Sequence, residues 1–313
     1  MKALFTYDYG KESMDKIRKL GYDILITNEN EAVFTNSYKD VEVLVCYNPF
    51  STLDISLMEQ LKWIQLSSIG IDQVPNDVVQ NNSIVVTNNR GGYSIPMGEW
   101  IVLKLLEIYK NSYGFHQRKQ KKEWFLDKSL LELYGKKILF IGTGTIAQEA
   151  AKRLQGFEME ILGINTNGEN APWFNKCYPT NMMAETIAKS DIVVLTLPYT
   201  EKTHHIIDSN SLKMMKDNGV LINVSRGSIV DEAALIEHLS NGHLMGVALD
   251  VFEREPLPKE SPLWDIDRVL ISSHNSWISE MRNARKYKMI YDNMKRFIEG
   301  KELLNKVNVN RGY

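Results

Sequence analysis

Two side chains with useful chemistry each follow an apolar, strand-like segment. Arg226 comes after Val220–Val224, and His274 comes after Val269–Ser272. The carboxyl ends of strands are where open α/β sheets bind ligands. A guanidinium matches a carboxylate at two points, and an imidazole exchanges protons near neutral pH. The pair therefore favours proton transfer beside a bound anion, although an arginine in this place is more commonly solvated. The other histidines lie in polar or helical settings typical of solvated side chains: His116, His204, His205, His238 and His243.

A glycine-rich turn indicates a site for a dinucleotide. The strand-like segment Lys137–Ile141 runs into Gly142-Thr143-Gly144-Thr145-Ile146-Ala147, and a helical pattern follows over Gln148–Leu154. In this pattern Gly142 permits the turn, Gly144 lets the backbone approach a pyrophosphate, and Ala147 lets helix and strand pack closely. The free N–H groups at the start of the helix then face the phosphates. An ordinary glycine turn is the alternative.

The next strand-like segment bears on the choice of cofactor. Glu160–Ile164 ends at Asn165-Thr166-Asn167-Gly168. A site specific for NAD usually has Asp or Glu here to hold the ribose 2′-hydroxyl. An amide removes the repulsion against a 2′-phosphate, yet this turn has no arginine to bind one. The sequence leaves NAD and NADP open, with a slight lean to NADP or dual use.

Short apolar runs alternate with helical patterns along the whole chain, which predicts an α/β protein with parallel sheets covered on both faces. A nearly all-apolar helix over Glu99–Tyr109 must be buried between layers, domains or subunits. A long amphipathic helix is expected over Ile278–Glu299. The expected strands are Ala3–Thr6, Asp23–Thr27, Val41–Cys46, Trp63–Leu66, Ile84–Thr87, Lys137–Ile141, Glu160–Ile164, Ile192–Leu197, Val220–Val224, Met245–Leu249 and Val269–Ser272.

Composition excludes several classes of protein. The formal net charge is −2 over 313 residues, so no broad attraction to nucleic acid is expected. The basic stretch Arg118–Lys122 is interpreted as a solvated face. Cys46 and Cys177 make neither a disulfide framework nor a zinc site, and no metal is expected. With no secretory signal and no apolar run long enough for a membrane span, the chain is expected in the cytoplasm.

Eight segments, taken in order, resemble the D-isomer-specific 2-hydroxyacid dehydrogenases. This group contains phosphoglycerate, glycerate/glyoxylate and D-lactate dehydrogenases, and the resemblance covers nearly the whole chain. The segments are Ser68–Pro75 (SIGIDQVP), Thr87–Gly91 (TNNRG), Gly98–Trp100 (GEW), Leu131–Lys136 (LELYGK), Leu197–Thr200 (LPYT), Asn223–Gly227 (NVSRG), Leu249–Pro256 (LDVFEREP) and Ser273–His274.

The resemblance implies two doubly wound parallel-sheet domains with the active site in the cleft between them. A Rossmann cofactor domain, residues 97–276, would be inserted into a flavodoxin-like substrate domain made of residues 1–96 and 277–313. The family tends to dimerise through its cofactor domains, so a homodimer is expected. The chain ends soon after its last helix, and the regulatory domain of some phosphoglycerate dehydrogenases is not expected.

The implied activity interconverts a small 2-oxo acid and its D-2-hydroxy acid with NAD or NADP. Arg226 would hold the carboxylate and polarise the carbonyl, and His274 would be the acid and base. Glu255, directly before Pro256, would orient His274, while the neighbouring Glu253 is interpreted as solvated. Formate dehydrogenases resemble this family but carry an amide in place of that glutamate, so Glu255 favours a hydroxyacid substrate.

The resemblance also implies further contacts with substrate and cofactor. Backbone N–H groups of Ser68-Ile69-Gly70 would bind the substrate carboxylate together with Arg226 and His274. Asp250 would face the nicotinamide carboxamide. The remaining residues expected at the cofactor are Gly142, Gly144, Thr145, Ile146, Asn165, Thr166, Asn167, Leu197, Pro198, Thr200, Thr203, Val224 and Ser225.

The chain departs from the family pattern after the histidine. Small apolar residues are common there, but this chain has Asn275-Ser276-Trp277. Trp277 would either wall the substrate pocket or begin the packing of the last helix. The segment Tyr47–Phe50 would line the other side of the pocket.

Two other functions remain open on the sequence. One is a dinucleotide-sensing binding protein on the same fold, like the C-terminal-binding-protein corepressors, which keep the arginine, glutamate and histidine. The other is an enzyme that oxidises a different small anion such as phosphite.

Overall fold

The computed structural model describes residues 1–309, which form two compact units. Unit 1 is Met1–Tyr93 together with the described residues from Ser279 onward, and unit 2 is Ser94–Ile278. The second unit is therefore an insertion within the first. That this second unit is the domain that binds the cofactor stays a prediction.

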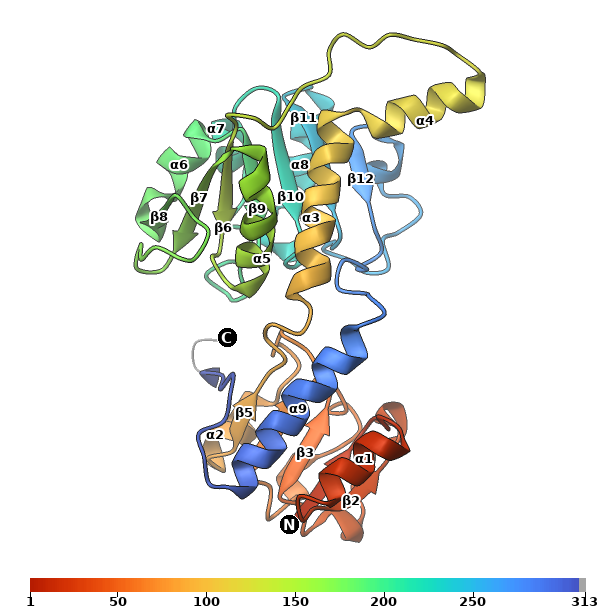
Figure 1. Ribbon diagram of the computed structural model, residues 1–313, viewed down its shortest axis with the longest axis vertical. Coiled ribbons are helices and arrows are strands. Elements are labelled where there is room, and N and C mark those ends of the chain that lie inside the picture. Colours follow the sequence, from red (N-terminus) through yellow and green to blue (C-terminus); the bar gives the residue numbers. More distant parts are fainter. Residues whose placement is uncertain (310–313) are drawn as a thin grey trace. The chain divides into compact units, whose positions relative to one another are not determined.

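Unit 1 is a five-stranded parallel sheet in the order β2-β1-β3-β4-β5. This is the flavodoxin-like order that the resemblance implied. The strands are short and mostly buried on both faces, as continuous apolar runs predict. Within residues 1–309 the α-helices α1, α2 and α9 accompany this sheet, as Figure 1 shows. The elements are β1 Lys2–Phe5, α1 Lys11–Arg18, β2 Asp23–Ile26, β3 Val43–Cys46, β4 Trp63–Leu66, α2 Asn76–Asn81, β5 Val85–Thr87 and α9 Arg282–Ile298.

The last helix of the chain, α9, completes the core of unit 1. Its residues Ile290 and Met294 are buried with side chains from α1 and from one face of the sheet. Asn293 is fully buried among them, and its Nδ2 donates to the Gln65 side chain on β4 at 2.8 Å. Its Oδ1 accepts from the backbone of Leu304 at 2.8 Å. A buried amide with partners for both its donor and its acceptor fixes the helix against the sheet.

Unit 2 is a seven-stranded parallel sheet in the order β12-β11-β10-β9-β6-β7-β8. It has the Rossmann order, extended by one strand, with helices on its two faces (Figure 1). The expected fold class is confirmed. The elements are α3 Ser94–Tyr109, α4 Ser112–Lys121, β6 Lys137–Ile141, α5 Thr145–Leu154, β7 Glu160–Asn165, β8 Lys176–Pro179, α6 Met183–Lys189, β9 Ile192–Leu195, α7 Ser209–Met214, β10 Gly219–Asn223, α8 Glu232–Ser240, β11 Leu244–Leu249 and β12 Val269–Ile271.

Helices α3 and α5 pack closely because a glycine faces the contact. A Cβ on Gly98 of α3 would lie 3.0 Å from the backbone nitrogen of Ala150 on α5. Ala147, Ala150 and Leu154 line the buried face of α5. Leu103 on α3 is 50% exposed in this single chain, so burial of that part of the apolar helix between subunits stays a prediction.

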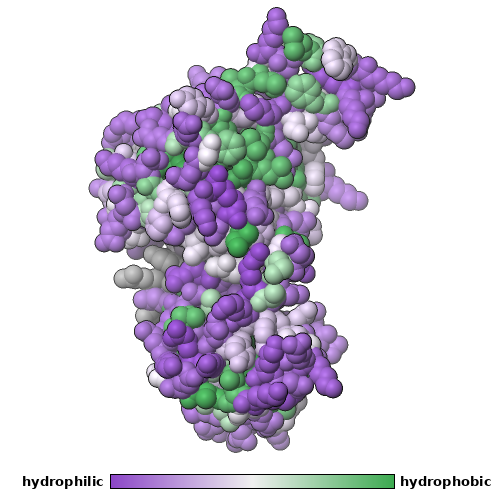
Figure 2. All heavy atoms as spheres, in the orientation of Figure 1, coloured by the Kyte–Doolittle hydropathy of each residue, from purple (hydrophilic) through white to green (hydrophobic). Residues whose placement is uncertain are grey.

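Residues 112–126 follow α3 in unit 2, and we call them the apolar arm after the exposed apolar side chains near their end. They begin with helix α4, none of whose residues is buried. The basic stretch Arg118–Lys122 lies on α4, and the Arg118 guanidinium stacks over the Phe125 ring at 3.8 Å. Trp124 and Leu126 are 102% and 74% exposed. Figure 2 shows apolar surface gathered over this end of unit 2. None of the helices within residues 1–309 is long and apolar enough to cross a membrane.

Candidate active site

His274 lies just beyond the carboxyl end of β12, in a turn with unusual backbone geometry. Its φ is +53°, a left-handed conformation that costs energy in a residue with a Cβ. Hydrogen bonds hold it there: its N–H donates to the Asp250 carbonyl at 2.8 Å, and its own carbonyl accepts from Trp277 Nε1 at 2.8 Å. These hydrogen bonds therefore fix the His274 backbone from which the imidazole side chain projects.

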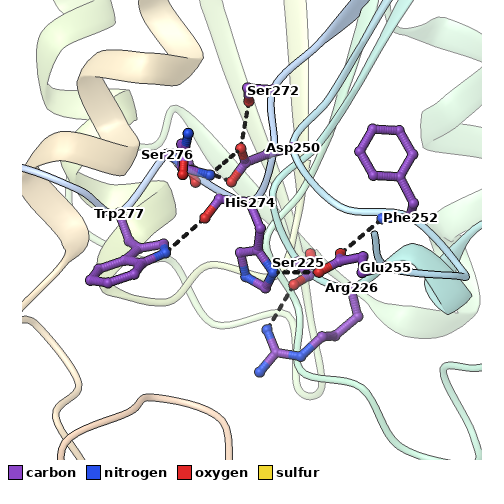
Figure 3. Close-up of polar contacts among 10 residues, drawn as sticks. Ser225, Arg226, Asp250, Phe252, Glu255, Ser272, His274, Ser276 and Trp277 are labelled. Atoms are coloured by element: carbon purple, nitrogen blue, oxygen red, sulfur yellow. Dashed lines mark hydrogen bonds and ion pairs between the residues drawn. The ribbon is translucent and has the colours of Figure 1, made fainter. Parts of the chain in front are cut away.

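Glu255 orients the imidazole ring. Its Oε2 lies 2.9 Å from His274 Nδ1, and its Oε1 accepts from the Phe252 N–H at 3.0 Å (Figure 3). A carboxylate at this distance assigns the proton of the neutral ring to Nδ1. Both side chains stay partly exposed, at 42% for His274 and 37% for Glu255. Nε2 is thus the nitrogen that can exchange a proton with a ligand.

The second glutamate of this loop has a different partner. Glu253 Oε1 lies 2.7 Å from Nε2 of His205 and also accepts from the Glu232 N–H at 3.2 Å. Glu253 is exposed and His205 is partly exposed, and their two side chains pair with each other at the surface. The structure places Glu255 and not Glu253 beside His274.

Asp250 anchors the turn that carries His274. Its side chain is fully buried at the end of β11. Oδ1 accepts from the Ser272 hydroxyl at 2.5 Å and from the Asn275 N–H at 2.8 Å, and Oδ2 accepts from the Ser276 N–H at 3.0 Å (Figure 3). The carboxylate thus binds one residue before His274 and two residues after it. That Asp250 also faces a nicotinamide stays a prediction.

Arg226 is held by a turn at the end of β10. The buried Asn223 shapes this turn, since its Oδ1 accepts from the Ser225 N–H at 2.9 Å and its Nδ2 donates to the Arg226 carbonyl at 2.9 Å. The guanidinium donates to the Ser225 carbonyl at 2.8 Å. In Figure 3 the side chains of Arg226 and His274 project to the same side of the strand ends.

A glycine brings the arginine turn and the glutamate loop together. A Cβ on Gly227 would overlap the backbone of Phe252 and of Glu253. Only glycine therefore lets the residue after Arg226 touch the loop that carries Glu255. A guanidinium and a carboxylate–imidazole pair are then held on adjacent turns, where they can bind an anion and move a proton.

The glycine turn after β6 has the geometry of a phosphate-binding turn. Gly142 has a φ of +97°, and a Cβ there would lie 2.8 Å from the Thr196 carbonyl oxygen. A Cβ on Gly144 would meet no protein atom within 4 Å, so packing within the protein does not require glycine there. Thr145 and Ile146 then open α5, and Ala147 is fully buried. This exposed backbone at a helix start fits the pyrophosphate of a dinucleotide.

The residues expected around the rest of the cofactor lie at the carboxyl ends of the neighbouring strands. Leu197 and Pro198 follow β9, and Thr203 stabilises their loop by donating to the Pro198 carbonyl at 2.9 Å. Val224 and Ser225 follow β10 and are buried. All of these strand ends are on one edge of a parallel sheet, the edge where such folds bind ligands.

Asn165 shapes the turn after β7 with both ends of its amide. Nδ2 donates to Thr143 Oγ1 at 3.0 Å and to the Glu169 carbonyl at 2.8 Å, while Oδ1 accepts from the Gly168 N–H at 2.7 Å. Thr166 and Asn167 are exposed at its tip. The amide thus links the glycine turn to this turn.

The Ser68-Ile69-Gly70 turn belongs to unit 1, at the end of β4. Ser68 Oγ lies 2.8 Å from the Gly70 carbonyl oxygen and accepts from Gln73 Nε2 at 3.0 Å. The Ile69 carbonyl accepts from Asn88 Nδ2 at 2.8 Å. The turn is thus fixed by its own unit.

Sequence reasoning missed the residues that shape these turns. None of these residues is proposed to contact substrate or cofactor. Their hydrogen bonds fix the segments that carry Arg226, His274 and Ser68, and they are Asn223, Ser272 and Gln73 respectively. The signal for Asn223 was available, since an amide that ends an apolar strand is often there to cap a turn. The described residues include no group of three or more His, Cys, Asp or Glu side chains that could hold a metal.

A family model matches most of unit 2. The model is that of the D-isomer specific 2-hydroxyacid dehydrogenase NAD binding domain, and it covers residues 102–276.

Two curated relatives and one solved structure resemble the chain over most of its length. Glyoxylate reductase of Pyrococcus furiosus is 36% identical over 263 residues, which are 75% of this chain and 73% of the relative. D-3-phosphoglycerate dehydrogenase of Methanocaldococcus jannaschii is 29% identical over 99% of this chain, which spans only 60% of that relative. A D-isomer specific 2-hydroxyacid dehydrogenase of Xanthobacter autotrophicus, solved with NADPH and MES, has a TM-score of 0.84 at 25% identity and covers 100% of this chain and 99% of its own.

Proposed function

The chain belongs to the D-isomer specific 2-hydroxyacid dehydrogenases, and on that premise we propose that it reduces a small 2-oxo acid to the D-2-hydroxy acid with NAD or NADP. The observation that carries the proposal is the 2.9 Å contact of His274 Nδ1 with Glu255, on a loop that touches the turn of Arg226. This arrangement provides a proton carrier and an anion binder on adjacent turns.

Each of the three side chains has a separate task in the proposal. The bound dinucleotide supplies the hydride when it is present. Arg226 binds the substrate carboxylate at two points and polarises the neighbouring carbonyl. His274 gives the proton on Nε2 to the carbonyl oxygen and takes it back in the reverse direction. Glu255 holds the ring in the correct tautomer and stabilises its protonated form after oxidation.

The remaining substrate contacts are proposed by family resemblance. Backbone N–H groups of Ser68, Ile69 and Gly70 would share the carboxylate with Arg226. The Trp277 indole would wall the pocket, which its bond to the His274 carbonyl supports, because that bond fixes the ring beside the catalytic turn.

For the cofactor we propose NADP at least as readily as NAD, with no metal. The residues proposed to bind it are those of the glycine turn, of the Asn165–Asn167 turn, and of the loops after β9 and β10. Asn165 has no negative charge to repel a 2′-phosphate. Asn165→Asp would restore that charge, so we expect it to raise the KM for NADPH relative to NADH. An unchanged ratio of the two KM values would contradict the role of this turn.

We also propose that the protein is a cytoplasmic homodimer. Support comes from the apolar arm, where Trp124 and Leu126 are exposed, and from Leu103 on the adjacent α3. Exposed apolar side chains that are grouped on one part of the surface are typical of a protein–protein interface. Light scattering on the purified protein should give about twice the chain's mass, and W124S with L126S should shift it toward monomer.

Steady-state kinetics test the proposed activity. The wild-type protein is mixed with NADH or NADPH and with glyoxylate, hydroxypyruvate, pyruvate and longer 2-oxo acids, and cofactor absorbance is followed. We expect His274→Ala and Arg226→Ala each to lower kcat/KM by about 100-fold or more, since acid–base catalysis contributes on that scale, while cofactor affinity survives. His205→Ala is the matched control, because this histidine also pairs with a glutamate of the same loop.

Three outcomes would contradict the proposal or part of it. Tight cofactor binding without turnover of any 2-oxo acid would favour the dinucleotide-sensing function instead. Wild-type rates in His274→Ala or Arg226→Ala would remove that residue from the mechanism. Reduction of NAD by phosphite would identify a different substrate class.

A further inference from the structure

A group of cationic and tyrosine side chains lies near the carboxyl ends of the strands of unit 1, and the proposed chemistry does not use it. The tyrosines follow β1 and β3 or precede α3, and the cations lie at the start of α9. We call this group the basic–tyrosine cluster. Its members are Tyr7, Tyr9, Tyr47, Tyr93, Arg282 and Lys286.

The Lys286 ammonium group lies beside two tyrosine rings. Its Nζ lies 5.2 Å from the centroid of the Tyr7 ring and 5.6 Å from that of Tyr9. These two rings meet edge to face at 5.0 Å. The contacts are cation–π interactions that position the ammonium group. Among the described residues, Lys286 makes no ion pair with a carboxylate.

Arg282 and Lys286 lie four residues apart on α9, so their side chains share one face of the helix. Burial lowers the pKa of Lys286, and the positive charge of Arg282 lowers it further, while Glu29 opposes both effects. Like charges held together disfavour the charged form unless an anion joins them. Glu29 is already committed to the local backbone, since its carboxylate accepts from the N–H groups of Tyr47 and Asn48 and from the Thr6 hydroxyl.

The cluster borders the turn proposed to bind the substrate carboxylate. The Tyr93 hydroxyl donates to the Ser67 carbonyl at 2.6 Å, one residue before that turn. Burial raises the pKa of Tyr93, while a hydrogen bond with Asn89 and the charge of Arg282 oppose this rise. Gln73 Nε2 links the other side, because it donates to Ser68 Oγ at 3.0 Å and to the Tyr47 carbonyl at 2.9 Å.

We propose that Arg282 and Lys286 bind a second anionic group of the substrate, so that the protein prefers 2-oxo acids whose side chain carries a carboxylate, phosphate or sulfonate. The inference rests on the proposed function and adds the substrate class. Two cations on one face of α9 attract an anionic group, whereas a neutral side chain gains no charge–charge attraction from them. The first carboxylate would lie at the Ser68–Gly70 turn that adjoins the cluster.

The test compares dianionic with monoanionic substrates. The ratio of kcat/KM for oxaloacetate, 2-oxoglutarate or 3-phosphohydroxypyruvate to that for pyruvate is measured in the wild type and in Arg282→Gln and Lys286→Gln. We expect the wild-type ratio to exceed one for at least one dianion. Each variant should lower that ratio by about 10-fold to 100-fold, the range for a lost charged hydrogen bond, mainly through KM. The preferred dianion distinguishes carboxylate from phosphate.

Controls separate binding from folding. Lys288→Gln on the same helix removes a 77% exposed lysine that pairs with Asp292, and it should leave the ratio unchanged. Arg282→Lys keeps the charge and should restore part of the ratio. Wild-type melting temperatures in these variants exclude misfolding.

The inference and the proposed function fail in different ways. A wild-type preference for pyruvate, or ratios unchanged in both Gln variants, would overturn the inference while the dehydrogenase activity stands. Calorimetric binding of D-malate and D-lactate gives a readout without turnover. Weaker D-malate binding in Arg282→Gln, with no turnover of any 2-oxo acid, would support the anion site and refute the proposed activity.

Discussion

Replacing Asp250 by asparagine tests whether this buried carboxylate positions the catalytic histidine. The amide keeps the size of the side chain and one oxygen, which can still accept from Ser272 and Asn275. The other oxygen becomes an NH₂ group that faces the N–H of Ser276, now 3.0 Å from that position. Two donors then face each other inside a turn where Ser276 is 2% exposed.

The magnitude follows from the bonds that change. A hydrogen bond to a charged group contributes about 1.5–3 kcal/mol, and a buried donor without an acceptor costs about 1–3 kcal/mol. Removing a buried charge offsets part of this loss, because burial of a carboxylate is itself unfavourable. We therefore expect the free energy of unfolding of unit 2 to fall by about 2 kcal/mol. A loosened turn should displace the imidazole, and kcat should fall by about 10-fold to 100-fold.

Urea unfolding and steady-state kinetics measure the two effects. Ser272→Ala is the matched control, because it removes only the hydroxyl donor to Asp250 and leaves both backbone donors in place. We expect it to cost about 1 kcal/mol or less. The cofactor dissociation constant, measured by calorimetry, should be the same in the wild type and both variants.

The opposite pattern would refute this reasoning. If Asp250→Asn unfolds like the wild type and mainly weakens cofactor binding, the carboxylate acts on the nicotinamide and not on the turn of His274. The family-based prediction for Asp250 would then hold, and the three hydrogen bonds would contribute little.

Three further perturbations follow from the same structure. Gly227→Ala would place a methyl group against the backbone of Phe252, so we expect kcat/KM to fall at least about tenfold while cofactor affinity holds. Gly142→Ala would combine a φ of +97° with a Cβ 2.8 Å from the Thr196 oxygen; calorimetry should show at least about tenfold weaker cofactor binding. Burial lowers the pKa of His238 below its usual 6.5, so acid protonates the unfolded state first, and stability falls as the pH drops from about 7 toward the lower folded pKa. In His238→Gln, the urea midpoint of unfolding should no longer fall with pH across this interval. A midpoint that falls as it does in the wild type would exclude His238 as the cause.

The buried strands were readable from the sequence because parallel sheets covered on both faces need continuous apolar runs. Trp63–Leu66 and Lys137–Ile141 are strands with the expected bounds, and most others shift by one or two residues. The edge strand Lys176–Pro179 was missed, since it mixes Lys, Cys, Tyr and Pro and has no apolar run. At the edge of a sheet, pairing with one neighbour is enough, and the sequence pattern is weak.

In the site, too, features of the local sequence could be predicted, and contacts between residues far apart in the chain could not. Arg226 and His274 stand out because each follows a strand, and the choice of Glu255 over Glu253 came from the family pattern. The partners of Asp250 could not be predicted, because its acceptors bind residues more than twenty positions away. Nor could the pair of Glu253 with His205, which joins two separate loops.

The hydrogen bond from the Asn293 amide to the Gln65 side chain has a consequence for how the protein is made. Residues 94–278 leave the ribosome before α9 has been synthesised, so the inserted unit can complete its sheet while the first one still lacks its final helix. Until then Gln65 has no Asn293 to bind and the surface that receives Ile290 and Met294 is open to water. The earliest part of the chain to emerge is thus the last to reach its finished core, and a nascent-chain protease assay should find it vulnerable longest.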